Sequence, residues 1–185
     1  DKNPGTIRTL IHHLESLFLI FRDPESEKIY TTLCGEKLLN DEDINDVMRY
    51  VILSNQYPSS ASAKKNVNLH PEIKIKPNVF VLKLLRDQEI SSLTAEELFI
   101  PIIYGHNSNC FDICKDKILQ IRSGKKWSEL IDDFHDDLYT PRKGHSDGSD
   151  ESLKNWKAYL KDITTTIIPL LSDVNLVHDY KESNV

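Results

Sequence analysis

The stretch RTLIHHLESLFLIFRDPESEKIYTTL, residues 8–33, decides how the first part of the chain folds, because its hydrophobic pattern changes partway along. Its first half, together with Ile7 just before it, has apolar residues at helical spacing. Such spacing predicts a helix with one buried face, which we expect to be formed by Ile7, Leu10, Ile11, Leu14 and Leu17. Pro4 and Gly5 are suitable residues for the start of this helix.

The second half of the stretch predicts a β-hairpin. Residues 18–21 are apolar and aromatic, and the run is too short for a helix, so it is expected to be a strand. Residues 22–28, RDPESEK, have the composition of a turn, and residues 29–32 form the returning strand. A helix followed by a hairpin is typical of the second half of a winged helix-turn-helix, in which the helix enters the DNA major groove.

The polar face of this helix therefore becomes a candidate DNA-binding surface. Arg8 can donate to guanine or to phosphate, and the neighbouring threonine and histidines can reach base edges or sugars. We predict that the contacts in this unit come from Thr6, Arg8, Thr9, His12, His13, Arg22 and Lys28. The alternative is an amphipathic helix whose polar face meets only water.

The remaining sequence predicts mostly helices. We expect a short helix over 35–39 capped by Thr32, and a second helix over 43–54 with a stripe of Met48, Val51 and Ile52. Three further helices are expected. The first starts at Pro77 and buries Val79, Phe80, Leu82 and Leu85. The second is opened by a capping box of Thr94 and Glu97 and contains Pro101, and the third spans 109–122. Free N–H groups at the start of the last helix favour phosphate, so Asn107, Ser108, Asn109 and Lys115 are predicted to form a second DNA contact.

The end of the chain repeats its beginning. LLSDVNLVHDYKES at 170–183 aligns with HLESLFLIFRDPES at 13–26, and each apolar run ends in a charged turn. We therefore expect a mostly α fold with small β-hairpins, built from tandem winged-helix or helix-turn-helix subdomains. The predicted divisions are a winged-helix unit at 1–54, a polar loop at 55–76, a three-helix unit at 77–127, an acidic linker at 128–151 and the start of another winged-helix unit at 152–185.

The net charge of −6 argues at first against a nucleic-acid partner, but the excess is local. Residues 128–151 hold eight acidic and two basic side chains, whereas residues 1–127 hold 17 of each. Residues 64–126 are locally basic, with 11 basic and seven acidic side chains. A neutral domain with basic faces can still bind a phosphate backbone.

Two groups of side chains invite a metal-site interpretation. His106, Cys110 and Cys114 are four residues apart, but the second pair of ligands usual for zinc is missing, and the cysteines continue an apolar face with Ile118 and Ile121. His135 lies among the acidic residues Asp132, Asp133, Asp136 and Asp137, which otherwise form a solvated face. Core packing and a charged linker are the simpler interpretations, so we predict no metal in this chain.

The order of five segments resembles the DNA-recognition region of type IIS restriction and nicking endonucleases of the AlwI kind. The segments are IYTTLCGEKLL, a helix ending in ILSNQYPS, IKPNVFVLKLL, SLTAEELFIPII and DKILQIR. The family's motifs fall at Thr32 and Gly35, 56–58, 80–85, 93–97 and 118–122. The resemblance spans about residues 8–127. Two departures are KPN at 76–78, where the family has an Asn-Pro order, and the acidic overall balance.

The resemblance implies a modular enzyme. A region of winged-helix subdomains reads an asymmetric site in double-stranded DNA, and a separate domain of the same polypeptide cuts DNA with Mg²⁺. The chain itself has no catalytic constellation: the acids of DPESEK at 23–28 lie too close together for a strand-borne nuclease site, and they occupy a turn. Two alternatives remain, a winged-helix regulator or protein-interaction module and a metal-dependent enzyme in its own right.

Composition sets the broad class. A content of 39% hydrophobic and 28% charged residues is that of a globular domain, and no apolar run has the length of a membrane span. Three cysteines and no visible signal peptide favour the cytoplasm. Because the first residue is Asp1 rather than Met, we expect the chain to be a piece of a longer protein.

Overall fold

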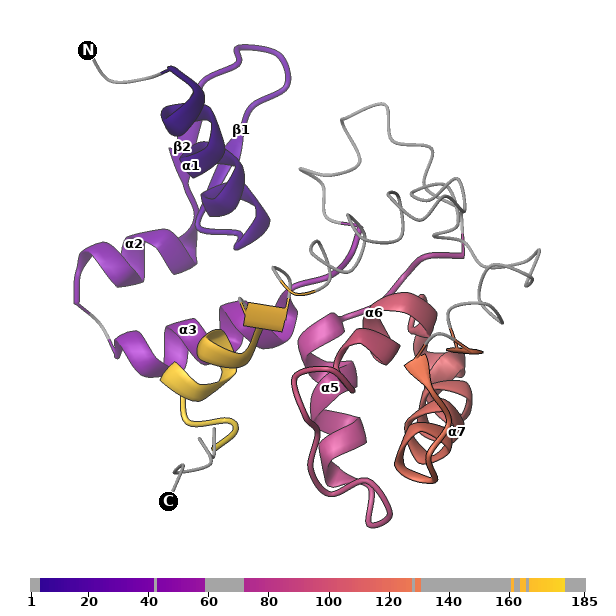
Figure 1. The fold of residues 1–185 in the computed structure, drawn as a ribbon. Coiled ribbons are helices and arrows are strands. Elements are labelled where there is room, and N and C mark those ends of the chain that lie inside the picture. The colour runs from indigo at the N-terminus through magenta and orange to yellow at the C-terminus, as the bar shows by residue number, and fades with distance from the viewer. Residues whose placement is uncertain are drawn as a thin grey trace. The chain divides into compact units, whose positions relative to one another are not determined.

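The computed structural model describes residues 4–41, 43–58, 72–127, 129–130, 161, 164–165 and 167–178. Its chain divides into two compact units, residues 1–68 and 69–185. Figure 1 shows that the described elements are mostly helices, with one two-stranded hairpin. The predicted class, mostly α with a small β-hairpin, is confirmed.

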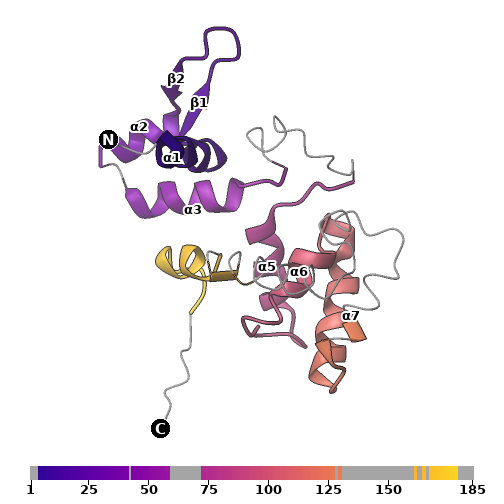
Figure 2. The same ribbon diagram turned by 45° about the horizontal axis from the view of Figure 1, so that its top comes forward.

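Unit 1 consists of three helices and the hairpin. Helix α1 (Pro4–Ser16) leads into β1 (Ile20–Arg22) and β2 (Ile29–Thr31), and α2 (Leu33–Leu39) and α3 (Ile44–Ser54) follow. The strands are antiparallel, with Phe21 opposite Tyr30, and these two rings stack at 5.4 Å between centroids. Figure 2 shows the hairpin extending away from α2 and α3.

The core of unit 1 is small. It consists of Leu19, Val47 and Val51, against which partly buried side chains pack from α1 and α2: Leu14, Leu17, Cys34 and Leu38. The predicted burial of Ile7 and Leu10 is wrong, because their side chains are 47% and 56% exposed. This core is reached only by the second half of α1, so the apolar residues of its first turns lie beyond it.

The first strand also begins later than predicted. We expected it over 18–21, but Phe18 has a φ of 55° and belongs to the turn that ends α1. Its N–H donates to Glu15 O at 3.1 Å, and the N–H of Leu19 donates to Leu14 O at 3.0 Å. This pair of bonds around a left-handed residue closes the helix and turns the chain toward β1.

The same helix ending occurs a second time, in the repeated sequence of unit 2. Residues 167–173 are helical, and Asn175, which aligns with Phe18, has a φ of 56°. Its N–H donates to Ser172 O, and the N–H of Leu176 donates to Leu171 O, both at 2.9 Å. The sequence repeat therefore has the same backbone hydrogen bonds in both units. Val177 and His178, which align with Ile20 and Phe21 of β1, are not in a strand, and the residues after them lie outside the described part of the chain.

Thr32 and Gly35 join α2 to the end of α1. As predicted, Thr32 caps α2, with its hydroxyl accepting from the N–H of Gly35 at 3.1 Å. The same hydroxyl donates to Phe18 O at 2.6 Å. A Cβ at Gly35 would lie 2.2 Å from Leu19 O, so this close approach of helix and strand requires glycine. Helix α2 begins at Leu33, two residues before its expected start.

Unit 2 contains α5 (Pro77–Arg86), α6 (Phe99–Tyr104), a 3₁₀ turn η1 (Ser108–Cys110) and α7 (Phe111–Arg122). Figure 1 shows α5, α6 and α7 side by side, and α5 and α7 both contact α6. Just before α5, the N–H of Lys74 donates to His106 O at 2.8 Å. The last part of the predicted 55–76 loop thus contributes two core residues, Ile73 and Ile75.

The helix faces of unit 2 agree with prediction in α7 and differ in α5. Cys110, Cys114 and Ile118 are buried as expected, and both cysteines are free thiols. On α5 only Phe80 is buried as expected, together with Asn78, Val81 and Leu84. Val79, Leu82 and Leu85 are half-buried instead, because α6 and α7 cover a face displaced around the helix from the one we predicted.

Arg122, at the end of α7, ties several loops of unit 2 together. Its guanidinium forms two hydrogen bonds with the buried Glu97, at 2.7 and 3.2 Å, and donates to Ile90 O at 2.9 Å and to Ser92 O. Glu97 also forms the predicted pair of hydrogen bonds with Thr94, accepting from the N–H of Thr94 at 2.8 Å while its own N–H donates to the Thr94 hydroxyl. These bonds close a turn ahead of α6 and do not cap it, because that helix begins at Phe99, later than predicted. Burial by itself would raise the pKa of Glu97, but the hydrogen bonds from Arg122 and Thr94 outweigh it and hold that pKa below 4.5.

We predict that Glu97→Gln destabilises unit 2 at pH 7 by about 2–3 kcal/mol, because the charged hydrogen bonds to Arg122 are lost. Since the pKa of Glu97 is lowered in the folded state, its stabilising effect is present above its ordinary pKa and is lost as the pH falls through the lowered value. The difference between wild type and variant should therefore shrink in acid. Urea unfolding followed by tryptophan fluorescence measures this, since both tryptophans lie in residues 69–185.

Glu96→Gln is the matched control, since it makes the same change at an exposed neighbour and should alter stability by less than about 0.5 kcal/mol. A Glu97→Gln deficit that stayed constant from pH 7 down to pH 3 would show that the ion pair does not stabilise this unit.

Candidate nucleic-acid interface

The predicted DNA-binding residues of unit 1 lie on α1 and the hairpin. Arg8, Thr9 and His13 are exposed on the helix, and Arg22 and Lys28 are exposed on the hairpin. Helix and hairpin are adjacent in the fold. Thr6 lies in α1, but its side chain falls outside the described part of the structure.

Glu15 connects the helix to the hairpin through charge. Its side chain is only 12% exposed, and its two oxygens lie 3.5 Å from Arg22 Nε and 3.6 Å from His12 Nδ1. The carboxylate holds Arg22 of β1 against α1 and offsets part of its positive charge. Sequence reasoning identified both basic partners but did not predict their pairing with this acid.

The turn of the hairpin is ordered by Asp23. Its carboxylate accepts from the N–H of Glu25 at 3.1 Å and from the hydroxyl of Ser26, and both bonds lower its pKa, the hydroxyl bond most. The N–H of Asp23 donates to Lys28 O at 2.9 Å, which closes the turn and leaves the Lys28 side chain in solvent. The Asp23 carboxylate therefore has a structural role in the turn.

The predicted second contact lies at the start of α7. Asn107 caps η1, accepting from the N–H of Asn109 at 2.9 Å, and Ser108 and Asn109 are exposed. These three residues form one polar turn.

Lys115 differs from that turn, because two acids already bind it. Its ammonium group lies 2.9 Å from Asp87 Oδ2 and also pairs with Glu89. The pKa of Lys115 is raised by hydrogen bonds to Glu89 and Asp87, and the pKa of Asp87 is lowered chiefly by Lys115. Its charge is therefore largely engaged within the protein.

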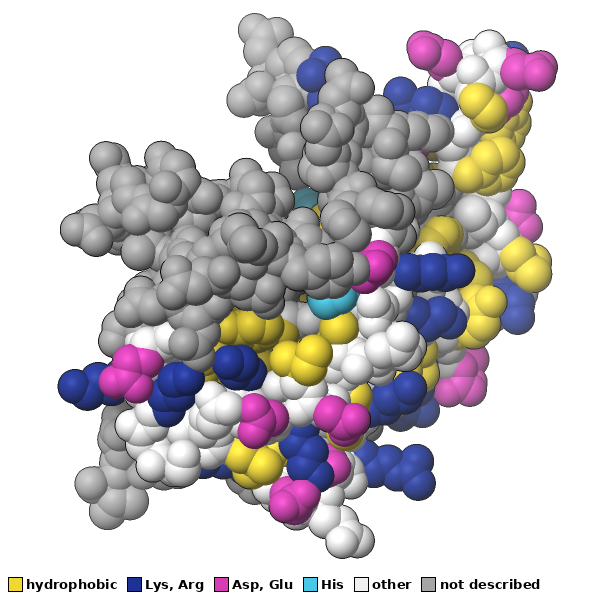
Figure 3. All heavy atoms as spheres, turned by 90° about the vertical axis from the view of Figure 1, so that its right-hand side faces the viewer, with side chains coloured by type: hydrophobic (Ala, Val, Ile, Leu, Met, Phe, Trp, Pro, Cys, Tyr) yellow, Lys and Arg dark blue, Asp and Glu magenta, His cyan; other side chains and the backbone are white. Residues whose placement is uncertain are grey.

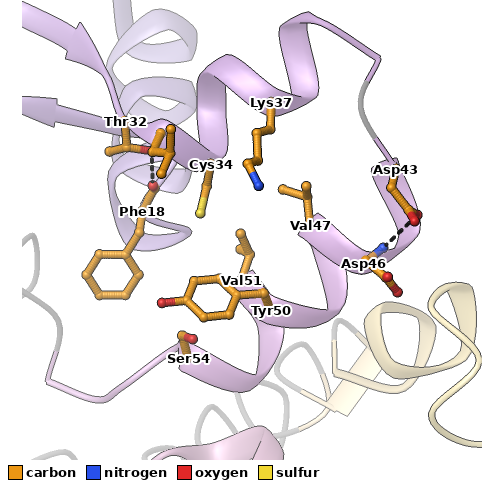
Figure 4. A pocket seen from close by; sticks show the side chains of 11 residues that line it. Phe18, Thr32, Cys34, Lys37, Asp43, Asp46, Val47, Tyr50, Val51 and Ser54 are labelled. Carbon is orange, nitrogen blue, oxygen red and sulfur yellow. Dashed lines mark hydrogen bonds between the residues drawn. The ribbon is translucent and has the colours of Figure 1, made fainter.

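A hollow of about 830 Å³ lies between α2 and α3 in unit 1. Figure 4 shows the side chains of Cys34, Lys37 and Tyr50 directed into it. Asp43, at its rim, caps α3, and its carboxylate accepts from the N–H of Asp46 at 3.4 Å. The lining combines apolar and aromatic groups with one lysine. Of its two acids, Asp43 caps α3 and Asp46 pairs with Arg49 at 3.4 Å, so we assign it no chemistry.

Metal binding was considered for two groups of residues. His106 lies 3.4 Å from Cys110 Sγ, but in the described part of the chain no three His, Cys, Asp or Glu side chains come together as metal ligands. The acidic group around His135 lies outside the described residues. None of the described helices is both long and apolar enough to cross a membrane.

The surface carries charges of both signs. In the view of Figure 3, Lys and Arg side chains lie next to acidic ones on the described part of the surface, with hydrophobic groups between them. Of the described residues, the large hydrophobic side chains that remain exposed lie in unit 1 with a single exception, Ile113.

Part of the chain matches a known protein family. Residues 1–108, more than half of the chain, match the family described as the N-terminal part of restriction endonuclease BpuJI. The chain belongs to the BpuJI N-terminal family. The matched region includes all of the described part of unit 1, together with α5, α6, Asn107 and Ser108. No curated protein matches the sequence.

Membership of the BpuJI N-terminal family confirms part of the resemblance seen in the sequence. The family is that of a restriction endonuclease, as expected, and its match to residues 1–108 overlaps the motif resemblance, which spans about 8–127, over residues 8–108. The narrower likeness to AlwI-type enzymes stays a prediction.

We predict that Glu15→Gln raises the affinity of the chain for duplex DNA, because it removes a negative charge beside α1 and releases Arg22. If Arg22 then pairs with a phosphate, the plot of log affinity against log salt should become steeper by up to about 0.9. Fluorescence anisotropy with a labelled duplex at several salt concentrations measures both quantities. Glu36→Gln is the control, since it removes an exposed acid from α2. Equal gains from both variants would mean that only net charge matters.

Proposed function

We propose that the chain is the sequence-specific, double-stranded DNA recognition region of a restriction endonuclease of the IIS type, with the AlwI-like organisation that its motifs suggest. The observation that carries this proposal is the family match, which covers the unit that joins α1 to the hairpin. An enzyme that cuts only near a defined site needs a part that reads the duplex, and the described residues bring no three His, Cys, Asp or Glu side chains together as metal ligands.

In this proposal unit 1 acts as a winged helix. Helix α1 enters the major groove, where Arg8, Thr9, His12 and His13 meet base edges, and the hairpin lies along the flanking backbone with Arg22 and Lys28. Thr6 belongs to the same face by its place in the sequence. The polar turn of Asn107, Ser108 and Asn109 forms the second contact, whereas Lys115, which the sequence also placed in it, stays paired with Asp87 and Glu89.

The repeated helix ending supports tandem subdomains. Because Phe18 and Asn175 share the left-handed conformation and the same pattern of hydrogen bonds, the helix before Asn175 is the counterpart of α1. In the proposal a second winged helix begins there.

Cleavage belongs to a different part of the polypeptide. We propose that a nuclease domain of the same chain supplies the Mg²⁺ site, in the cytoplasm, where a restriction enzyme meets DNA. The described residues do not bring together the carboxylates that such an ion needs, and we place the Mg²⁺ site in the nuclease domain.

Selection from a randomised duplex library, at low and at physiological salt, tests the function directly. Enrichment of one short asymmetric sequence is the expected result and would supply the recognition site. If no sequence is enriched, and binding is weak and lost at physiological salt, the chain is not a self-sufficient specificity domain.

We predict that Arg8→Ala weakens binding to the selected site by about 1–3 kcal/mol and relaxes the preference at one base pair, as removal of a bidentate guanine contact would. Binding of the selected duplex and of its single-base variants measures this. Arg49→Ala is the comparison, since it removes the same charge from α3. Loss of affinity by the same factor on every duplex would assign Arg8 to phosphate, and no loss would remove α1 from the interface.

A second candidate function, contact with protein, rests on the apolar surface of unit 1. Leu33 and Leu39 on α2 are 70% and 74% exposed, and Tyr50 on α3 is 64% exposed. Exposed apolar groups gathered on one small unit are typical of a surface that another protein covers. We propose the nuclease domain of the same polypeptide as that partner.

Hydrogen exchange tests this contact. In a polypeptide that includes the nuclease domain, amides of α2 and α3 should exchange more slowly than in the chain alone. The pair of changes Leu33→Gln and Leu39→Gln should remove this extra protection, whereas Ile113→Gln in unit 2 should leave it intact. Identical exchange in the longer and shorter polypeptides would exclude the contact.

A further inference from the structure

Helix α5 and the segment before it form a basic surface that the predicted interface does not include. Between Glu72 and Asp87 the chain has four basic side chains and no acidic one, although the whole protein has a net charge of −6. The four are Lys74, Lys76, Lys83 and Arg86, and all are exposed. We call them the α5 basic row.

The exposed side of α5 carries its share of the row. Phe80, Val81 and Leu84 face the core, whereas Lys83 and Arg86, three residues apart, lie on the opposite side of the helix. At 1.5 Å per residue, the distance along the axis from Lys76 to Arg86 is about 15 Å.

Within the described part of the chain, the charges of the row have no oppositely charged partner. The acids that follow Arg86 do not neutralise it, because Asp87 and Glu89 are both bound to Lys115.

Helix stability does not explain the whole row. Lys83 and Arg86 lie in the last turn of α5, where a cation stabilises the helix dipole. Lys76, by contrast, is the N-cap of α5, and Lys74 precedes it, at the end where the dipole disfavours cations. Lysines kept at the unfavourable end indicate an anionic partner outside the protein.

The row also adjoins a segment already considered for DNA. Lys74 and Asn107 form a parallel bridge, so the beginning of the row lies beside the polar turn of Asn107, Ser108 and Asn109. A continuous surface thus runs from this turn through Lys74 and Lys76 to α5.

We infer that the α5 basic row binds the phosphate backbone of duplex DNA without reading its sequence. This inference rests on the proposed function. It adds to the contact at the Asn107 turn another contact in unit 2, which positions the DNA. Three of the four side chains are lysines, which are point charges without the fork that matches guanine. Phosphates of one strand follow about every 3.4 Å of duplex axis, so a row of about 15 Å faces several of them.

The test compares pairs of substitutions in the complete 185-residue chain. One variant carries Lys83→Gln and Arg86→Gln. A second carries Lys74→Gln and Lys76→Gln, which remove charges from the N-terminal end of α5, where a cation does not stabilise the helix dipole. The control carries Lys37→Gln and Lys126→Gln, which remove two exposed charges outside the row. Each is titrated with the library-selected duplex, a scrambled duplex and double-stranded RNA of equal length, over a range of salt concentrations.

We expect both row variants to bind selected and scrambled DNA more weakly by the same factor, about fivefold or more at low salt, with the salt slope reduced by up to about 1.8. The control should bind like the wild type. Three results would overturn the inference: unchanged affinity and slope in both row variants, an equal loss in the control, or a loss confined to RNA.

The design separates this inference from the function on which it rests. If the wild-type chain enriches a site and the row variants bind it normally, the row has no role while recognition through α1 stands. If the wild-type chain binds no duplex at all, the proposed function fails and the inference fails with it.

Discussion

The pairing of Arg122 with Glu97 is the interaction on which unit 2 depends. A single guanidinium at the end of α7 holds the carboxylate of Glu97 and two backbone carbonyls of the loop between α5 and α6. A buried acid needs such a partner, since an unpaired charge away from water would cost several kcal/mol. Because one side chain joins these three segments, the positions of α5 and α6 relative to α7 are fixed by charge as well as by apolar packing.

Local features of the fold could be predicted well from the sequence. The cap supplied by Thr32 and the paired hydrogen bonds of Thr94 with Glu97 depend on residues three positions apart, so the chain itself displays them. The second pair nevertheless misplaced the start of α6, which lies at Phe99. The hairpin was also predictable from neighbouring residues, because a charged turn separates two short apolar runs. The buried face of α7 followed from its periodicity, because one side of that helix meets the core along most of its length.

Features that depend on distant residues could not be predicted in this way. Glu97 and Arg122 are 25 positions apart, and no pattern in the sequence couples them. Ile7 and Leu10 have the spacing of core residues, yet the core of unit 1 is too small to reach them. Phe18 gave no sign of a left-handed conformation, which its counterpart Asn175 adopts more readily.

The candidate interface shows the same division. Periodicity identified the polar face of α1, but not that Glu15 neutralises part of it or that Lys115 is already bound by two acids. The α5 basic row was visible in the sequence as a run without acids. The inference that the row binds phosphate depended on knowing which charges are paired in the fold.

The left-handed residue that ends α1 has a consequence for how such a protein can change over evolutionary time. At Phe18, and again at Asn175, backbone hydrogen bonds set the direction in which the chain leaves the helix. The outward-facing side chains of the preceding turns take no part in these bonds. Mutations can therefore change the outward-facing residues of the helix while the exit angle stays constant, so that a new surface is open to selection without a redesign of the scaffold.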